Sequence, residues 1–298
     1  MKYSLLLFLA PLGVWSRACT CGQANQNGAY SRNENVIPRA ENADEMLDRR
    51  DVHDGLAEKR DDLYARLING KPTGLHEYPF IAAVVYNSGA KRISCPGAII
   101  DKKHILITAH CVNGIRANNI GVYAGSNKFD VPSAKLRTVA AIHPHPKWDS
   151  ERRFYDVALL QLQDPLSFDR NTNIVCVPSQ PRDFNNQTAT ALAWGSPSSG
   201  EGQLVQTKFE THNLDSCSVR GTGGPQFCTY APGEGVCDNA SDGPLLLWQE
   251  PTSRRYFAVG LSSWGQSCKK FPEVATDLTQ LKPWIQEVVG AGGGTLCP

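Results

Sequence analysis

Ten cysteines spread along 298 residues are the feature that most limits how this chain can fold. An even, well-spaced set of cysteines indicates disulfides, which persist in oxidising compartments outside the cytosol. Residues 1–18, MKYSLLLFLAPLGVWSRA, agree with that destination, because an early lysine precedes a short apolar run and small residues. This pattern predicts a secretory signal peptide; a signal anchor is the alternative, although the run is too short to span a bilayer. We therefore expect a secreted, extracellular protein.

The balance of charges argues against two kinds of partner. The chain has 30 Lys and Arg against 29 Asp and Glu, a formal net charge of +1. Nothing in this balance favours nucleic acid or an anionic membrane surface. No later stretch reaches the roughly 18 uninterrupted apolar residues that a membrane helix needs. We expect neither a nucleic-acid partner nor a membrane partner.

Residues 19–66 differ in composition from the rest of the chain. They mix Glu, Asp, Arg and Lys densely with little apolar periodicity, which predicts a solvated segment that is disordered apart from its cysteines. Two dibasic pairs and Arg66 offer exposed cleavage points. We interpret the segment as a propeptide cut between Arg66 and Leu67; a solvated linker that is never cut is the alternative.

Residues 67–298 have the sequence pattern of a β protein. Short runs such as FIAAVVY, HILITA, VALLQL, TALAWG and FAVGLSSW are separated by clusters of Gly, Pro, Asn and Asp, a spacing typical of antiparallel strands. Only DLTQLKPWIQEVV, residues 277–289, spaces its apolar residues as a helix does. The pattern predicts one all-β sandwich or barrel domain with a closing helix.

Three residues in this framework have the types that acyl transfer requires. His110 follows a strand in ILITAHC, Asp156 begins an apolar strand in FYDVALLQL, and Ser241 lies in CDNASDGPLLLW. A serine hydroxyl becomes a good nucleophile when an imidazole accepts its proton and a carboxylate orients that imidazole. Each residue alone is weak evidence, and the flanking motifs strengthen it.

Those motifs, RLING, TAHC, DVALL, SDGPLLLW and SSWG, resemble the trypsin/chymotrypsin family of serine peptidases over residues 67–289. The resemblance implies two six-stranded antiparallel β-barrels with a C-terminal helix. It also implies a monomer without cofactors, made as a zymogen, which an activating protease cuts and which takes a protein or peptide in its cleft. Its catalytic residues would be His110 as base, Asp156 as orienting carboxylate and Ser241 as nucleophile. More narrowly, CTYAPGEGVC and LLLWQEPTSRRYFAVG are similar to trypsin-like proteins of insect venoms and secretions.

The resemblance also implies most of the disulfide pairing. It pairs Cys95 with Cys111, Cys217 with Cys228, and Cys237 with Cys268. The family often links its propeptide to the body through the position of Cys176, so either Cys19 or Cys21 takes that role and the other reaches Cys297. The sequence does not distinguish these two pairings.

The chain departs from the family around its nucleophile. Where the family reads Gly-Asp-Ser-Gly-Gly-Pro, this chain reads Asn239, Ala240, Ser241, Asp242, Gly243 and Pro244. In the family, the new amino terminus pairs with the aspartate before the serine, and Ala240 offers no carboxylate for that pairing. A buried ammonium without a partner is unfavourable by several kcal/mol. Asp242 adds negative charge where a negatively charged intermediate would form, and loss of one oxyanion donor slows such reactions about 100- to 1,000-fold.

The expected substrate pocket has changed as well. By alignment its floor is Gly235, where trypsin-like members carry aspartate, and a wall glycine is replaced by Glu273. Glu273 could restore an acidic pocket for Lys or Arg, or its side chain could fill the pocket, which we favour slightly. Ser263, Trp264 and Gly265 keep the edge that pairs with an extended peptide.

Two further motifs concern modification and metals. Asn186 and Asn239 begin acceptor sequons for N-linked glycan, and Asn186, in a polar loop, is the better candidate. His143 and His145 lie close together in IHPHPKWD, but no partners stand at ligand spacing, so we expect a solvated loop and no metal. The stretch AGSNKFDVPS lacks the glutamates of calcium-binding relatives, so we expect no calcium there.

Two functions follow from these observations. The first is a secreted protease homologue that keeps His110, Asp156 and Ser241 but has weak or absent hydrolysis and acts by binding. The second is an active serine endopeptidase made as a zymogen. We favour the first, because a triad without its oxyanion hole loses the larger part of its catalytic effect.

Overall fold

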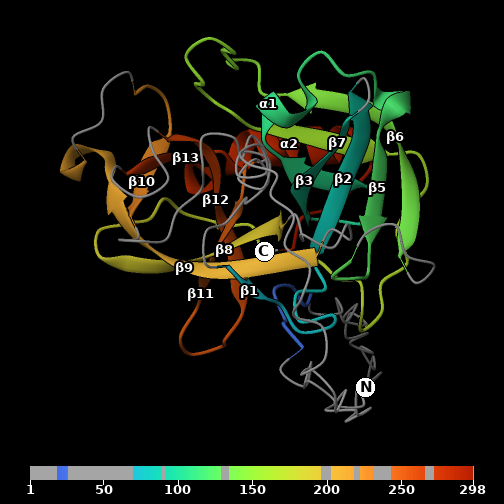
Figure 1. Cartoon of the computed structure of the whole chain (residues 1–298), viewed down its shortest axis with the longest axis horizontal. Coiled ribbons are helices and arrows are strands. Elements are labelled where there is room, and N and C mark those ends of the chain that lie inside the picture. Colours follow the sequence, from blue (N-terminus) through green and yellow to red (C-terminus); the bar gives the residue numbers. More distant parts are fainter. Residues whose placement is uncertain are drawn as a thin grey trace, which may run out of the picture.

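The structure, a computed structural model, describes residues 19–25, 70–88, 91–128, 134–195, 203–217, 222–230, 243–265 and 272–297. Two closed six-stranded antiparallel β-barrels lie side by side (Figure 1). The first barrel closes in the order β2-β3-β4-β7-β6-β5, and the second closes through β8, β9, β10, β13, β12 and β11. The structure confirms the fold expected from the resemblance.

The strands of the first barrel are β2 (Ile81–Ser88), β3 (Lys91–Ile99), β4 (His104–Ile107), β5 (Gly121–Ala124), β6 (Lys135–Pro144) and β7 (Ala158–Leu162). Those of the second are β8 (Gln187–Gly195), β9 (Gln203–Asn213), β10 (Gln226–Tyr230), β11 (Leu245–Gln249), β12 (Tyr256–Gly265) and β13 (Glu273–Asp277). A short β1 (Lys71–Pro72) adds to the outer edge of β9. Short helices are α1 (Ala109–Val112), η2 (Ala117–Asn119), η3 (Leu214–Ser216) and η4 (Leu278–Gln280).

Alternation along the strands explains how the barrels pack. Successive side chains of a strand point to opposite faces. In β7, Leu160 joins the apolar cluster inside the first barrel, whereas Leu159 joins a cluster to which both barrels contribute. Leu192 and Trp194 of β8 lie in that shared cluster, and the Trp194 indole donates to the Ala82 carbonyl across the boundary. The apolar faces of two barrels are therefore buried against one another.

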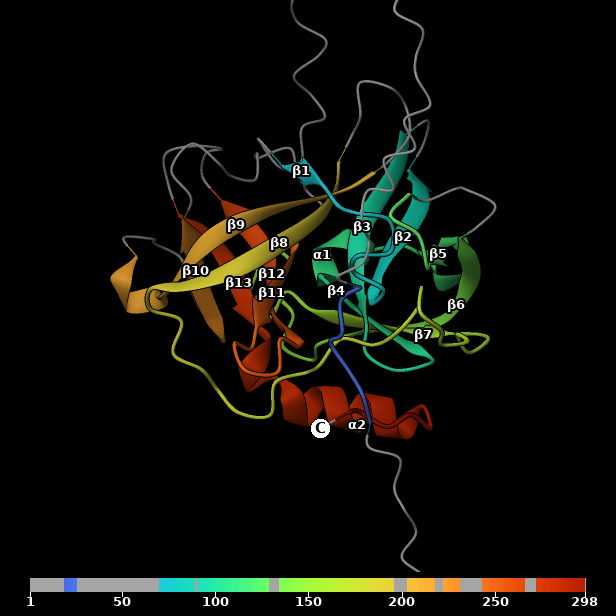
Figure 2. The ribbon, with the colours of Figure 1, turned by 90° about the horizontal axis from the view of Figure 1, so that it is seen from below.

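The closing helix α2 (Lys282–Ala291) runs along one side of both barrels (Figure 2). It buries Ile285 and Val289 in the shared apolar cluster. The helical spacing in the sequence extended back to residue 277, but the structure has a separate turn, η4, before α2 begins at Lys282. Pro283 explains the division, because proline fits the first helical turn and disrupts a helix interior.

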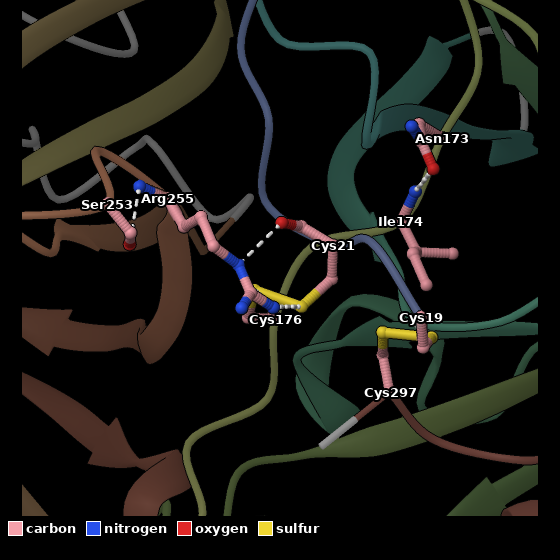
Figure 3. Close-up of a disulfide and its surroundings, with 8 residues drawn as sticks. All are labelled: Cys19, Cys21, Asn173, Ile174, Cys176, Ser253, Arg255 and Cys297. Atoms are coloured by element: carbon pink, nitrogen blue, oxygen red, sulfur yellow. Dashed lines mark hydrogen bonds between the residues drawn. A yellow bond between two sulfur atoms is a disulfide. The ribbon is translucent and has the colours of Figure 1, made fainter. Parts of the chain in front are cut away.

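A short amino-terminal segment, residues 19–25, is part of the folded body (Figure 3). Cys21 pairs with Cys176 and Cys19 pairs with Cys297. Between barrel segments, Gly22 donates to the Ile174 carbonyl at 2.8 Å and accepts from the Tyr256 N–H at 2.7 Å. The structure thus assigns the two pairings that the sequence left open. The proposed signal peptide and residues 26–66 lie outside the described residues.

Candidate active site

His110 and Asp156 lie together at the junction of the barrels. His110 is in α1, directly after β4, and Asp156 stands two residues before β7. The Nδ1 atom of His110 lies 2.5 Å from Oδ2 of Asp156, and the backbone N–H of His110 donates to Oδ1 at 2.8 Å. Asp156 is fully buried. This geometry holds the ring with Nδ1–H toward the carboxylate, so Nε2 is the nitrogen that can accept a proton.

The second barrel supplies further contacts to Asp156. Ser263, on β12, donates its hydroxyl to Oδ2 of Asp156 at 2.5 Å. The Thr276 hydroxyl, on β13, donates to the Asp156 carbonyl at 3.2 Å. A buried carboxylate needs such donors because desolvation disfavours its charge. Ser263 was predicted as part of the substrate edge, and its side chain also positions the carboxylate.

The predicted nucleophile Ser241, with Asn239, Ala240 and Asp242, lies outside the described residues. The description resumes at Gly243, which is buried and has a φ of 54°. A side chain is excluded at Gly243, because a β-carbon there would lie 2.4 Å from Cγ2 of Thr108. Thr108 precedes His110 by two residues, so the described end of the nucleophile motif packs against the histidine segment.

The predicted pocket wall lies on β12 and β13. Gly265 pairs with Glu273 in the ladder between them. Glu273 is only 5% exposed, and its Oε2 accepts a bond from the Ser262 hydroxyl at 3.2 Å. A β-carbon on Gly265 would lie 2.9 Å from Cγ of Glu273, so the glycine gives the glutamate its room. Gly235, the predicted floor, lies outside the described residues.

Some of the other predicted residues are described by the structure, and some are not. Cys95 pairs with Cys111, and Cys217 pairs with Cys228. Asn186 is exposed in the turn before β8. The predicted cleavage residues Arg66 and Leu67, and the predicted pair Cys237 and Cys268, lie outside the description.

The two neighbouring histidines are less exposed to solvent than the sequence suggested. His143 is within β6, and its ring meets the Gln161 side chain at 3.3 Å. His145 is 9% exposed and stacks on Tyr155, with the Trp284 ring edge-on to it. Burial, and secondarily the charge of Lys147, lowers the pKa of His145 below its ordinary value. The expectation of a solvated loop was wrong for His143, which belongs to β6, and for the exposure of His145, which follows β6 in a turn but is buried against Tyr155 and Trp284.

Across the described residues, no three His, Cys, Asp or Glu side chains gather in a way that could hold a metal ion. Within those residues no helix is both long and apolar enough to cross a membrane.

Sequence reasoning missed a cavity beside the His110–Asp156 pair. It is open, has a volume of about 610 Å³, and is lined by Glu151, Arg152, Arg153, Phe154 and Trp264. The guanidinium of Arg153 lies 3.9 Å from Oδ2 of Asp156. The run ERRF immediately before the YD of Asp156 was a signal available in the sequence.

Comparison with known proteins gives a consistent set of similarities. A family model for trypsin matches residues 67–285. A venom serine protease of Polistes dominula is 28% identical over 220 residues, covering 68% of this chain and 78% of that protein. Hypodermin-B of Hypoderma lineatum is 29% identical over 238 residues, covering 76% and 88%. Venom serine protease 34 of Apis mellifera is 28% identical over 238 residues; the match covers 74% of this chain but only 58% of that protein's length.

Proposed function

Because this chain belongs to the trypsin family, we propose that it is a secreted homologue that binds a protein or peptide in its cleft and hydrolyses peptide bonds weakly or not at all. The observation that carries the proposal is Ala240, which stands where the family has the aspartate that receives the new amino terminus. Secretion is supported by the signal-peptide pattern of residues 1–18 and by the disulfides.

Activation would require a partner for a new terminus at Leu67. An ammonium group buried without a carboxylate is unfavourable by several kcal/mol. Two buried carboxylates of the described cleft already have partners: Asp156 binds His110 and Ser263, and Glu273 binds Ser262. Neither is a ready replacement for the missing aspartate, so cleavage after Arg66 by an activating protease should not order the site.

The oxyanion loop supports the same conclusion. Asn239 replaces a glycine whose N–H must turn toward the developing negative charge, and Asp242 adds a carboxylate next to Ser241. Asparagine tolerates unusual backbone angles, so the change at residue 239 alone is tolerable. The loss of one oxyanion donor slows acyl transfer by about 100- to 1,000-fold, and here the terminus that orders the whole loop lacks its partner.

The edge of β12 offers a site for peptide binding by strand addition. Trp264 and Gly265 pair with β13 on one side. On the other side, the ladder with β11 begins at Leu261, and the last contact is the Ser262 N–H with the Pro244 carbonyl. Among the described residues, β12 beyond Ser262 therefore has an unpaired edge, which an extended peptide can extend as a further strand.

We assign Glu273 the role of filling the primary pocket. The Glu273 side chain is buried, accepts a hydrogen bond from the Ser262 hydroxyl and packs against Gly265. At position 273 the family has a glycine. An acidic pocket for Lys or Arg is the alternative role for this carboxylate.

The second candidate function is an active serine endopeptidase made as a zymogen. It is favoured by the geometry of His110, Asp156 and Ser263, which matches what a general base needs.

One experiment separates the two functions. The purified chain is cut after Arg66, then given a fluorophosphonate probe and a panel of peptide substrates, with Ser241→Ala as the matched control. We expect no more labelling or turnover than the control shows. Prompt labelling at Ser241 together with turnover would contradict the proposal and establish the endopeptidase.

A further inference from the structure

The cavity beside Asp156 has a chemical character that the proposed function does not explain. Two aromatic side chains, Phe154 and Trp264, line it together with two arginines, Arg152 and Arg153, and one glutamate, Glu151. Trp264 belongs to the β12 edge on which a peptide would lie, so a side chain of that peptide can reach the cavity.

The wall that carries the arginines is fixed by its own hydrogen bonds. Oδ1 of Asp149 accepts the backbone N–H groups of Glu151 and Arg152, both at 3.0 Å. The N–H of Asp149 donates to the Phe154 carbonyl at 3.1 Å, which closes the loop. The wall is thus built before any ligand arrives, which reduces the ordering cost of binding.

The second barrel clamps the same wall. The Gln226 amide donates to the Arg153 carbonyl at 3.3 Å, and its oxygen accepts the Gly223 N–H at 2.8 Å. A β-carbon on Gly223 would lie 2.5 Å from the Phe154 ring, so only glycine allows this contact. Arg153 itself has a φ of 57°, a left-handed conformation that non-glycine residues rarely adopt. Such strain persists where the surroundings fix it, and it concentrates at functional sites.

The charges of the cavity favour an anion. Arg153 is partly exposed, with 36% of its side chain accessible. Its guanidinium forms an ion pair with Oδ2 of Asp156 at 3.9 Å, which is too long for a hydrogen bond. The same oxygen already binds His110 and Ser263. Across the described residues, the guanidinium of Arg153 makes no hydrogen bond, so its donors remain available. Of the charged side chains that line the cavity, two are arginines and one is Glu151, whereas the buried Asp156 that pairs with Arg153 does not line it.

We propose that this cavity binds an acidic side chain, aspartate or glutamate, of a peptide that lies along β12, with Arg153 as the residue that determines the preference. The inference rests on the proposed function, because it names the class of ligand that the cleft takes. Guanidinium groups form strong, often bidentate hydrogen bonds with carboxylates, and the aromatic walls lower the local polarity and strengthen them. An uncharged glutamine side chain would lack the negative charge and the second acceptor oxygen of the carboxylate.

The test uses the full secreted chain and fluorescein-labelled pools of short peptides, in which one position is fixed as Glu, Gln or Lys and the others are randomised. Fluorescence anisotropy measures binding. We expect one fixed position at which the Glu pool binds about 10-fold more tightly than the Gln pool, as one charge-assisted hydrogen bond would give. Arg153→Gln should abolish that difference without weakening the Gln pool, and Arg116→Gln, at an exposed arginine elsewhere, should preserve it.

The possible outcomes distinguish failure of the cavity assignment from failure of the proposed peptide-binding function. If no pool binds, the proposed binding function fails and the cavity assignment fails with it. If pools bind but Glu and Gln are equal at every position, or if Arg153→Gln keeps the difference, only the cavity assignment is overturned. Arg153→Glu serves as a second variant, because it reverses the charge of the cavity wall. If this variant is folded, it should bind the Lys pool more tightly than the Glu pool, which a misfolded protein would not do.

Discussion

The hydroxyl of Ser263 donates a 2.5 Å hydrogen bond to Oδ2 of Asp156, although the two residues belong to different barrels. The same oxygen faces Nδ1 of His110. The buried carboxylate therefore depends on the second barrel for one of its donors. This dependence makes the site a structural element of the barrel junction, whether or not the protein is an active enzyme.

Ser263→Ala should lower the free energy of unfolding by about 1.5–3 kcal/mol, because it removes a buried hydrogen bond to a charged group. Urea unfolding followed by fluorescence measures this change and requires no enzymatic activity. Ser167→Ala, at an exposed serine, should change the free energy of unfolding by less than about 0.5 kcal/mol. Equal effects of the two substitutions would show that the Asp156 bond adds nothing to stability.

Cleavage after Arg66 should leave the amino-terminal fragment attached to the body, because Cys19 and Cys21 bind Cys297 and Cys176. Electrophoresis should show one species without reductant and two species with it. The double variant Cys19→Ser with Cys21→Ser should release the fragment without reductant, whereas either single variant should retain it. Release from a single variant would mean that one of the two disulfides does not form.

His145 should make the protein less stable in mild acid. Its folded-state pKa is lowered by burial, while the unfolded chain takes up a proton near the ordinary value of 6.5. The unfolded state therefore binds more protons as pH falls below about 6.5, and stability decreases until the lower folded-state pKa is passed.

Urea unfolding between pH 8 and pH 5 measures the effect of His145. His145→Gln should reduce the loss of stability on acidification, because glutamine does not titrate and can still accept the Lys147 N–H. His143→Gln, at a histidine that contacts Gln161 instead, should keep the pH dependence of the parent. An unchanged pH dependence in His145→Gln would refute this assignment.

Asn186 should carry an N-linked glycan when the chain is secreted from eukaryotic cells. It is exposed in the turn before β8, which meets the accessibility requirement of the modification. Intact-mass measurement before and after glycosidase treatment should show one glycan, and Asn186→Gln should remove it. If Asn239→Gln removes the glycan instead, the modified sequon is the one beside Ser241.

The sequence predicted the parts of the fold that repeat as patterns. Short apolar runs such as the one that forms β7, separated by turn residues, predicted an all-β domain with a closing helix. The two barrels were implied only by the family resemblance that the motifs around His110, Asp156 and Ser241 carry. The helix boundary was less accurate, because the apolar spacing continues through η4 and only Pro283 marks the start of α2.

Features set by contacts between distant segments could not be predicted. Cys19 and Cys21 are chemically equivalent in the sequence, and the choice depends on how Gly22 pairs with Ile174 and Tyr256. The burial of His145 depends on ring contacts with Tyr155 and with Trp284 of α2, which the stretch IHPHPKWD alone does not reveal. The cavity at Arg153 likewise needs Gln226 and Gly223 of the second barrel.

We propose that the neighbours of Ser241, rather than the triad, suppress hydrolysis. The most direct test compares the parent with the double variant Ala240→Asp and Asp242→Gly, both cut after Arg66, by measuring kcat/KM on one peptide panel. We predict that the double variant gains at least about 100-fold, the effect of regaining one oxyanion donor, while Asp156→Asn in that background abolishes the gain. A parent chain that already matches the double variant would show that these neighbours do not suppress hydrolysis.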